Sequence, residues 1–480
     1  MILRNITIKD CCGCSVCNAV CPTKAIHMDA DELGFFYPSI NDTVCVECEC
    51  CVAVCPVINK HLLANNKYLM KSSYAGYIKD AKKLSESASG GAAAALSEQI
   101  ISKGGVVFGV EYDNHLMPVW GFANNTEEVS RFKGSKYAES IRRDIFKTIQ
   151  KEVITGKPVL VIGLPCDIAA IRMFLGETSV SENLFMCELI CSRATSQKVL
   201  KESIRVIEER ERKKVVSLSL RHKKNGIALP SFVRYTFNDG SELCELSTES
   251  DFLYAFCFIV RESCYNCSFK NNNSVADLRL GDYWGLNKSH SYYNPYGTSL
   301  IISCSNQGDK LMQFLNRNEF FIEETDLTEA CAYNFMTIES FNKDSFSDTY
   351  ITEFLANGFH SARKAIIDLQ ARNLSDISKD IDFRKDNIAL WGIGNAADIL
   401  YKKLKMSEWN IRHVFDSSSM KIGLDFNGYD VKNIYDIMMY SDEIDVVATT
   451  ISSVPESELV LQVEQLGFNG KVVYLGQLRV

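Results

Sequence analysis

Two runs of cysteines near the start of the chain carry the clearest chemistry in the sequence. Each run has the spacing C-x2-C-x2-C-x3-C and is followed directly by a proline, Pro22 in the first run and Pro56 in the second. The runs comprise Cys11, Cys14, Cys17 and Cys21, and then Cys45, Cys48, Cys51 and Cys55. Thiolates at this spacing bind 4Fe-4S clusters. The pattern therefore predicts a protein that transfers single electrons.

The fourth cysteine of each run predicts how the eight ligands are shared. In bacterial-type ferredoxins, three cysteines of a run bind one cluster and the fourth binds the other cluster. We therefore expect one cluster on Cys11, Cys14, Cys17 and Cys55, and a second on Cys45, Cys48, Cys51 and Cys21. Zinc also binds C-x2-C pairs, but it needs two pairs rather than two unbroken quartets. Cys12 and Cys50 lie off the pattern, and we expect neither to be a ligand.

The composition is typical of a globular protein in a reducing compartment. The 480 residues are 46% hydrophobic and 23% charged, which suits two to four domains. The net charge of −8 argues against a nucleic-acid partner. The most apolar window, residues 158–176, contains Asp167 and Arg172, so it predicts a buried strand and helix rather than a membrane span. Nineteen cysteines without an N-terminal export signal indicate metal or redox chemistry, and we expect a cytoplasmic protein.

The hydrophobic pattern predicts an α/β protein of several domains. Residues 1–60 are expected to form a ferredoxin-type α+β module, which its two 4Fe-4S clusters stabilise because it has little hydrophobic core. Residues 74–350 alternate strand and helix patterns, which predicts a mixed α/β domain. Residues 351–385 predict a polar helical linker, and residues 386–480 predict a Rossmann-like α/β half-domain.

Two loops of the middle region have residue types that suit a phosphate-bearing ligand. The first loop comprises Ser87, Ser89, Gly90 and Gly91. It precedes a helix predicted over residues 92–101, whose free amides favour a phosphate; an ordinary helix cap with nothing bound is the commoner use of such residues. The second loop comprises Gly134, Ser135, Lys136 and Tyr137. Its lysine and tyrosine suit a phosphate and a ring, and they also suit a simple surface turn.

Four further cysteines lie where α/β proteins place their sites. Cys166 follows a strand predicted over residues 159–162, and Cys191 follows the next strand, predicted over residues 184–190. If these strands are adjacent, both sulfurs lie at one edge of the sheet, and the helix start at Cys166 favours a thiolate. Cys264 and Cys267 add a third C-x2-C spacing. The four residues suit a third cluster or a zinc ion; alternatively, Cys166 is a nucleophile and Cys264 and Cys267 are a redox pair.

In their order along the chain, these motifs resemble the beta-subunit family of coenzyme F420 hydrogenases and dehydrogenases, which contain flavin and iron–sulfur clusters. The matching pieces are residues 87–91, 134–137, 164–166, 189–192, 264–270 and 277–285. Each piece is weak alone, whereas the ordered set is specific. The N-terminal double ferredoxin module fused to this region also resembles known bacterial members.

The resemblance implies an FAD lined by the loops 87–91 and 134–137. It also implies a third 4Fe-4S cluster held by Cys166, Cys191, Cys264 and Cys267. The family usually has Cys-His-Gly where this chain has Cys191, Ser192 and Arg193. This departure concerns the neighbouring pocket, so the resemblance does not identify the substrate.

The last domain contains the fingerprint of a nucleotide-binding fold. A strand predicted over residues 388–391 runs into Gly392, Gly394 and Ala397 of a G-x-G-x-x-A turn, and the next predicted strand leads to Asp416. Such glycines let a phosphate approach the backbone and the acidic residue binds a ribose, which predicts a nucleotide such as NAD. The unit is similar to nucleotide-fold modules appended to bacterial glycan-biosynthesis proteins. A Rossmann-like fold that binds only a partner or nothing fits the sequence equally well.

These features together predict an iron–sulfur flavoprotein oxidoreductase, although no catalytic residue can be named. A flavin exchanges two electrons as hydride and a cluster carries one, so the protein would couple a hydride substrate to a redox partner protein. The hydride partner would be coenzyme F420, NAD(P)H or an activated sugar, and the last domain favours the sugar and a role in polysaccharide biosynthesis. The alternative is a non-catalytic electron-transfer subunit that serves a separate enzyme.

Overall fold

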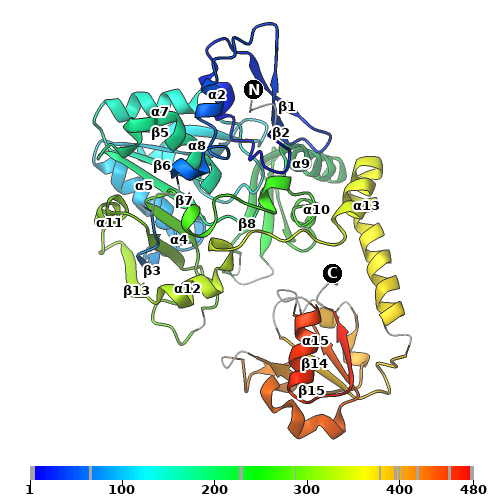
Figure 1. The fold of residues 1–480 in the computed structure, drawn as a ribbon. Helices are drawn as coiled ribbons and strands as arrows, with labels where there is room; N and C mark the ends of the chain where they lie inside the picture. Colours follow the sequence, from blue (N-terminus) through cyan, green and yellow to red (C-terminus); the bar gives the residue numbers. More distant parts are fainter. Residues whose placement is uncertain are drawn as a thin grey trace. The chain divides into compact units, whose positions relative to one another are not determined.

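The structure is a computed structural model that falls into two compact units, Met1–Ile351 and Thr352–Val480 (Figure 1). It describes residues 6–63, 68–224, 226–227, 231–286, 288–377, 380–393, 397, 400–402, 404–417, 421–451 and 456–475. Within these ranges no helix is both long enough and apolar enough to cross a membrane. Each unit is described by itself.

The first unit begins with a small module around the two cysteine runs, dark blue in Figure 1. Its elements are α1 (Val16–Val20), β1 (Ile26–Ala30), β2 (Phe36–Ile40), α2 (Cys50–Ala53) and α3 (Lys60–Leu63). The two strands form an antiparallel hairpin in which Ile26 lies opposite Ile40. Its own apolar core consists of Cys17, Ile26 and Cys51 with a few half-buried neighbours. A core this small agrees with a module that depends on bound groups and on its neighbours for stability.

The larger part of the first unit is built on an eight-stranded mixed sheet in the order β13-β3-β12-β11-β7-β6-β4-β5. The strands are β3 (Ser72–Ile78), β4 (Val106–Tyr112), β5 (Pro118–Ala123), β6 (Val159–Gly163), β7 (Leu184–Leu189), β11 (Leu278–Asp282), β12 (Ser299–Ser303) and β13 (Phe320–Thr325). The four central strands β4, β6, β7 and β11 are parallel neighbours, and the outer pairs are antiparallel. Parallel neighbours bring the ends of β6 and β7 to one edge, as the positions of Cys166 and Cys191 predict.

Helices cover both faces of this sheet. They are α4 (Ala81–Glu86), α5 (Ala92–Ser102), α6 (Thr126–Val129), α7 (Ile145–Ile154), α8 (Pro165–Leu175), α11 (Asn306–Met312) and α12 (Leu327–Tyr333). The alternation along β6 shows the two layers: Val159 and Val161 pack in one apolar core with α7 and α8, and Leu160 packs in the other with α4 and α5. Cys14 and Val16 belong to the first of these cores, so the N-terminal module packs on that face of the sheet.

A second layer of the first unit is a three-stranded antiparallel sheet in the order β10-β9-β8. Its strands are β8 (Val215–His222), β9 (Phe232–Phe237) and β10 (Glu242–Leu246), and the nearby helices are α9 (Gln197–Glu211) and α10 (Asp251–Ala255). Ser196 begins α9 by accepting a hydrogen bond from the Val199 amide, a common N-terminal cap.

The helix α13 (Ser347–Ile377) runs from the end of the first unit into the second, and its backbone breaks at Gly358, which has a φ of 79°. The second unit has a six-stranded sheet in the order β16-β17-β15-β14-β18-β19 and a Rossmann-like fold. Its elements are β14 (Ile388–Trp391), β15 (Ile411–Asp416), β16 (Asp425–Phe426), β17 (Tyr429–Asn433), β18 (Val446–Thr449), α15 (Glu456–Gln465) and β19 (Lys471–Tyr474). All neighbours except β16 and β17 run parallel, which is the arrangement of a nucleotide-binding half.

Candidate functional site: three groups of cysteines

The first group of cysteines lines a hollow inside the N-terminal module, called the inner site here. Four of the cysteines that line it are Cys11, Cys14, Cys17 and Cys55, the set expected from the spacing for one cluster. The hollow measures about 330 Å³, counting the space open to solvent, and Val16, Met28 and Pro38 contribute apolar walls. Burial and the nearby sulfurs of Cys11 and Cys55 raise the pKa of the Cys17 thiol to about 12. Thiolates packed this closely need a positively charged group between them, and iron fits this donor set.

The second group lines a separate hollow nearer the surface, called the outer site here. Its lining includes Cys21, Cys45, Cys48 and Cys51, the set expected for the second cluster, in about 300 Å³ that also includes open space. Cys48 is exposed, and the side chain of Val46 beside it is 63% exposed. Burial acts to raise the pKa of Cys21, but bonds from the Thr23 hydroxyl and the Ala25 amide outweigh it and lower the pKa. An amide pointing at a sulfur stabilises its charged form.

The third group of cysteines converges inside the α/β domain, at what we call the middle site. Cys166 lies in the first turn of α8, directly after β6, and Cys191 lies two residues beyond β7. Cys264 ends a short 3-10 turn, Glu262–Cys264, and Cys267 follows in the next loop. Burial, together with the nearby Cys166 and Cys267, raises the pKa of Cys264 to about 12. The sulfurs of Cys166, Cys264 and Cys267 also raise the pKa of Cys191, in addition to burial. The structure therefore brings all four residues together.

Three hydrogen bonds hold the loops of the middle site. The buried ammonium of Lys270 donates to the backbone carbonyls of Cys191 and Met336. The amide of Cys267 donates to Ser340 Oγ at 2.9 Å. Among the described residues, no three His, Cys, Asp or Glu side chains meet closely enough to hold a single metal ion. None of the nineteen cysteines forms a disulfide bond.

Cys12 joins the N-terminal module to the middle site. It is not expected to be a cluster ligand, and its thiol lies within hydrogen-bonding reach of both Cys14 and Cys166. The contact with Cys12, followed by burial, raises the pKa of Cys166 well above its ordinary value. The inner and middle sites are therefore direct neighbours, a relationship that spacing along the chain could not reveal.

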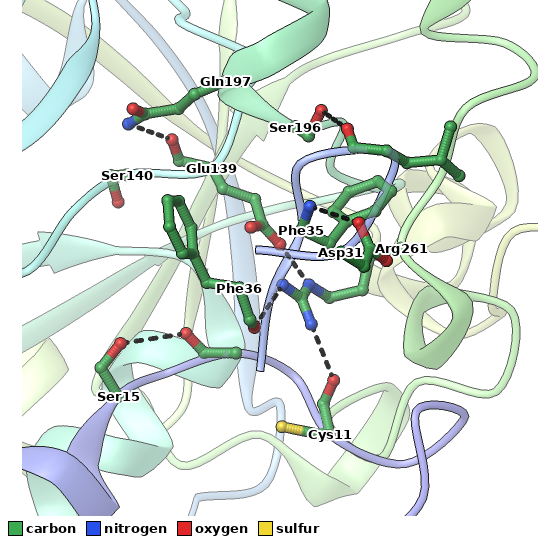
Figure 2. Close-up of polar contacts among 12 residues, drawn as sticks. Cys11, Ser15, Asp31, Phe35, Phe36, Glu139, Ser140, Ser196, Gln197 and Arg261 are labelled. Carbon is green, nitrogen blue, oxygen red and sulfur yellow. Dashed lines mark hydrogen bonds and ion pairs between the residues drawn. The ribbon is translucent and has the colours of Figure 1, made fainter. Parts of the chain in front are cut away.

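The hairpin of the N-terminal module is fastened to the α/β domain by polar contacts, several of which Figure 2 shows. Ser196 Oγ donates to the Leu33 carbonyl, and the Lys198 ammonium donates to the Glu32 carbonyl at 2.5 Å. The next residue of the hairpin, Gly34, has a φ of 86°, and a Cβ atom there would overlap the side chain of Lys198. Only glycine suits this position, because both the backbone angle and the close approach exclude a side chain.

The first expected flavin loop is packed tightly against the sheet. Ser87 Oγ donates to the Lys83 carbonyl at 2.7 Å, and Ser89 Oγ donates to the carbonyls of Gly281 and Thr298 at 3.2 and 3.0 Å. A Cβ atom on Gly90 would overlap the backbone of Gly76 and Ser299, and Gly91, with a φ of 81°, begins α5. The hydroxyl groups of this turn therefore bond to the protein itself. This is the behaviour expected of an ordinary helix cap, the alternative to a phosphate-binding turn.

The second expected flavin loop contains a buried lysine rather than a surface turn. Lys136 Nζ lies within hydrogen-bonding distance, 2.9–3.4 Å, of four carbonyls, those of Arg131, Phe132, Lys133 and Gly134. Burial lowers the pKa of Lys136 to about 7. Gly134 is exposed and Ser135 is half-buried, and the ring of Tyr137 packs edge-on against Phe256 at 5.2 Å. Lys136 thus organises its own loop.

A group of polar residues that were not expected from the sequence lies where the two loops meet. Arg221, at the end of β8, pairs with Asp282 of β11, and Tyr137 lies beside it. Arg221 Nη2 and Asp282 Oδ1 are buried and have no hydrogen-bond partner among the described residues. The guanidinium lies 5.1 Å from the ring of Trp284. Asp282 lies within the motif at residues 277–285, and this motif is the one feature of the sequence that could have pointed to this group.

The glycine turn of the second unit is described only in part. Gly392 has a φ of 92°, and Gly394 lies outside the described residues. Asp416 ends β15, as expected, and its Oδ2 accepts from the Ile393 amide at 2.8 Å and from Lys421 Nζ at 3.0 Å. The carboxylate therefore holds the start of the glycine turn and a nearby cation.

Comparison with known families agrees with the three parts of the chain. Residues 10–59 match the model described as a 4Fe-4S dicluster domain. Residues 156–329 match the model for the C-terminal region of the beta subunit of coenzyme F420 hydrogenase/dehydrogenase. Residues 383–471 match the model described as a CoA binding domain. No curated protein matches the chain significantly.

Similar solved structures include a chain of the F420-reducing [NiFe] hydrogenase complex from Methanosarcina barkeri. It is 15% identical, with a TM-score of 0.39 over 64% of this chain and 95% of that one. The Rex-family repressor RSP is 15% identical, with a TM-score of 0.17 over 26% of this chain and 75% of that one. RSP in complex with beta-NAD+ and operator DNA is 16% identical over 22% of this chain and 56% of that one, also with a TM-score of 0.17.

The family matches and the cysteine spacing lead to one identification. The chain is an iron–sulfur redox protein with an N-terminal 4Fe-4S dicluster domain and a C-terminal Rossmann-like domain, and its residues 156–329 match the model of the coenzyme F420 hydrogenase/dehydrogenase beta-subunit family.

Proposed function

We propose that this protein is a flavin-dependent oxidoreductase that couples hydride transfer in the α/β domain to single-electron transfer through three 4Fe-4S clusters. The observation that carries the proposal is the contact of Cys12 with Cys14 and Cys166. It joins the inner and middle sites within one compact unit. The three sites then form a continuous series from the exposed Cys48 to the interior of the α/β domain.

The ligands follow from the three groups of cysteines. Cys11, Cys14, Cys17 and Cys55 would hold one cluster at the inner site, and Cys45, Cys48, Cys51 and Cys21 a second at the outer site. Cys166, Cys191, Cys264 and Cys267 would hold the third at the middle site. A bound 4Fe-4S cluster would supply one-electron chemistry at each site. The exposure of Cys48 and Val46 makes the outer site the place where a redox partner protein docks.

The flavin would bind where the loops 87–91 and 134–137 meet. A bound FAD would supply the exchange of hydride for single electrons. The spare Nη2 donor of Arg221 suits a phosphate or a ring carbonyl, and Trp284 and Tyr137 offer aromatic surfaces beside it. The loop 87–91 would contact the flavin through its backbone, because its hydroxyl groups already bond to carbonyls of the protein.

The hydride partner is coenzyme F420, NAD(P)H or an activated sugar. The family match in residues 156–329 supports the first. The attached Rossmann-like domain supports a role with a nucleotide-linked substrate, including an activated sugar in glycan biosynthesis. An Asp416 carboxylate next to Lys421 would suit a phosphorylated ribose in that domain.

A second function is favoured by one observation. Because Ser89 and Lys136 both donate to backbone carbonyls, the expected flavin loops offer a ligand few free side chains. The protein would then be an electron-transfer subunit without flavin, and its partner enzyme would carry the catalytic site.

Metal and flavin analysis of the full chain, purified without oxygen, separates these functions. Roughly 12 iron atoms and one FAD per chain are expected for three clusters and a flavoenzyme. Roughly 12 iron atoms without flavin would favour the electron-transfer subunit. Roughly eight iron atoms, with zinc at one per chain, would reassign the middle site to zinc and contradict the proposal.

A further inference from the structure

Two buried arginines of the α/β domain reach across to the ligand loop of the inner site. Arg142 Nη1 donates to the Gly13 carbonyl at 2.9 Å, and its Nε donates to Asp167 at 2.8 Å. Its side chain is 9% exposed. Because Asp167 follows Cys166 directly, Arg142 links the inner site to the first turn of α8.

Arg261 makes the second link, which Figure 2 shows. Its Nη1 donates to the Cys11 carbonyl at 3.1 Å, its Nη2 donates to the Phe36 carbonyl at 3.0 Å, and its Nε pairs with Glu139. The side chain is only 3% exposed. A Cβ atom on Gly13 would lie 2.6 Å from this guanidinium, so the loop can approach it only because residue 13 is glycine.

Arg261 lies between two cysteine sites. Its guanidinium bonds to the carbonyl of Cys11, an inner-site ligand, and its own backbone carbonyl accepts a hydrogen bond from the amide of Cys264, a middle-site ligand, at 2.9 Å. Glu139 bonds to Nε of this guanidinium, whereas Nη1 bonds to the cysteine loop. Arg142 differs, because both its Nε and its Nη2 bond to the carboxylate of Asp167. Arg261 therefore brings a buried cation directly to the backbone of an inner-site ligand.

We propose that Arg261 is a positioning residue that fixes the inner site against the middle site and makes the inner cluster easier to reduce than it would be without this cation. The proposal rests on the proposed function, since it requires clusters at these sites. Each reduction adds one electron and one negative charge to a cluster, and a buried cation beside the site stabilises that charge. A reduced protein partner would supply one electron to the outer cluster, and the outer cluster would return to its oxidised state as it passes that electron to the inner cluster.

The test is a potentiometric titration of the full chain, monitored by electron paramagnetic resonance, in paired variants of opposite sign. Arg261→Gln removes the cation, and we expect the reduction potential of the inner cluster to fall while that of the outer cluster stays. Glu139→Gln leaves the cation without its partner, and we expect the inner potential to rise. Arg261→Lys keeps the charge, and we expect a potential closer to the wild type than that of Arg261→Gln. Arg205→Gln, on the exposed face of α9, is the matched control.

The outer cluster is identified by faster relaxation in the presence of a soluble paramagnetic ion, because Cys48 is exposed. Potentials that do not move, or that move in the same direction in Arg261→Gln and Glu139→Gln, would overturn the proposal. If Arg261→Gln fails to fold, Glu139→Gln decides alone: a rise supports the proposal and any other result contradicts it. An iron content too low for the expected clusters in the wild type would instead refute the proposed function.

Discussion

Glu139→Gln also provides a stability test of the contact between the N-terminal module and the α/β domain. The substitution leaves the Arg261 charge buried without its carboxylate partner, since the two side chains are only 3% and 10% exposed. Removing one partner of a buried ion pair costs about 3–5 kcal/mol. Arg261 keeps its bonds to the carbonyls of Cys11 and Phe36 and its place over the ring of Tyr37. We therefore expect a cost near the lower limit, about 3 kcal/mol.

The assay is the rate at which the iron–sulfur absorbance disappears in a fixed urea concentration without oxygen. Cluster loss is irreversible, so stability is read as a rate. If the contact is broken at the barrier, a cost of about 3 kcal/mol accelerates the loss about 100-fold. The control is Glu209→Gln, which removes an exposed partner of Arg205 on α9 and is expected to change the rate less than about two-fold. Equal rates for the two variants would refute the reasoning.

Three further predictions test separate parts of the structure. Cys264→Ser should leave roughly eight of 12 iron atoms per chain and spare the N-terminal clusters, measured by iron analysis. Gly34→Ala should speed cluster loss about ten-fold or more, because its Cβ would overlap Lys198 in addition to the strain of a positive φ, which costs about 1 kcal/mol. Lys136→Met should remove a rise in stability between about pH 7 and pH 10, measured from unfolding temperatures of the two proteins.

The reason for the pH effect is the difference between the folded and unfolded protein. Burial lowers the pKa of Lys136 to about 7, whereas an exposed lysine keeps a pKa near 10.4. In this window the unfolded chain binds one proton more, so the stability of the wild type rises with pH relative to Lys136→Met. A difference in unfolding temperature between the two proteins that does not change with pH would contradict this prediction.

For Gly34→Ala the control is Gly104→Ala, because Gly104 has the same kind of backbone angle and open space around it.

Local spacing and periodicity predicted much of the fold and the cysteine sets. The runs from Cys11 to Cys55 depend on short-range spacing, so the two hollows of the N-terminal module contain the expected cysteines. The strand predicted over residues 159–162 has a local apolar signature, and the observed strand β6 (Val159–Gly163) and the helix α8 that follows it agree with the prediction. Family models match residues 10–59, 156–329 and 383–471, and the structure divides the chain into two compact units, Met1–Ile351 and Thr352–Val480, so the finer domain boundaries stay predictions.

What the sequence could not predict depends on contacts between distant residues. Arg261 lies 250 positions from Cys11, and nothing in its local pattern distinguishes it from a surface arginine. In the sequence, Cys12 is only a cysteine outside the ligand spacing, and its contact with Cys166 is visible only in the folded chain. Lys136 was open to interpretation as a surface turn, because the carbonyls that surround it come from the shape of its loop rather than from residue types.

The most direct test of the central claim is the number of electrons that the full chain accepts. The protein would be titrated with dithionite without oxygen, and cluster and flavin absorbance would be followed together. Three clusters and one flavin predict about five electrons per chain, one for each cluster and two for the flavin, with bleaching of the flavin band. About two electrons and no flavin band would contradict the account, because only the two clusters of the N-terminal module would then take part.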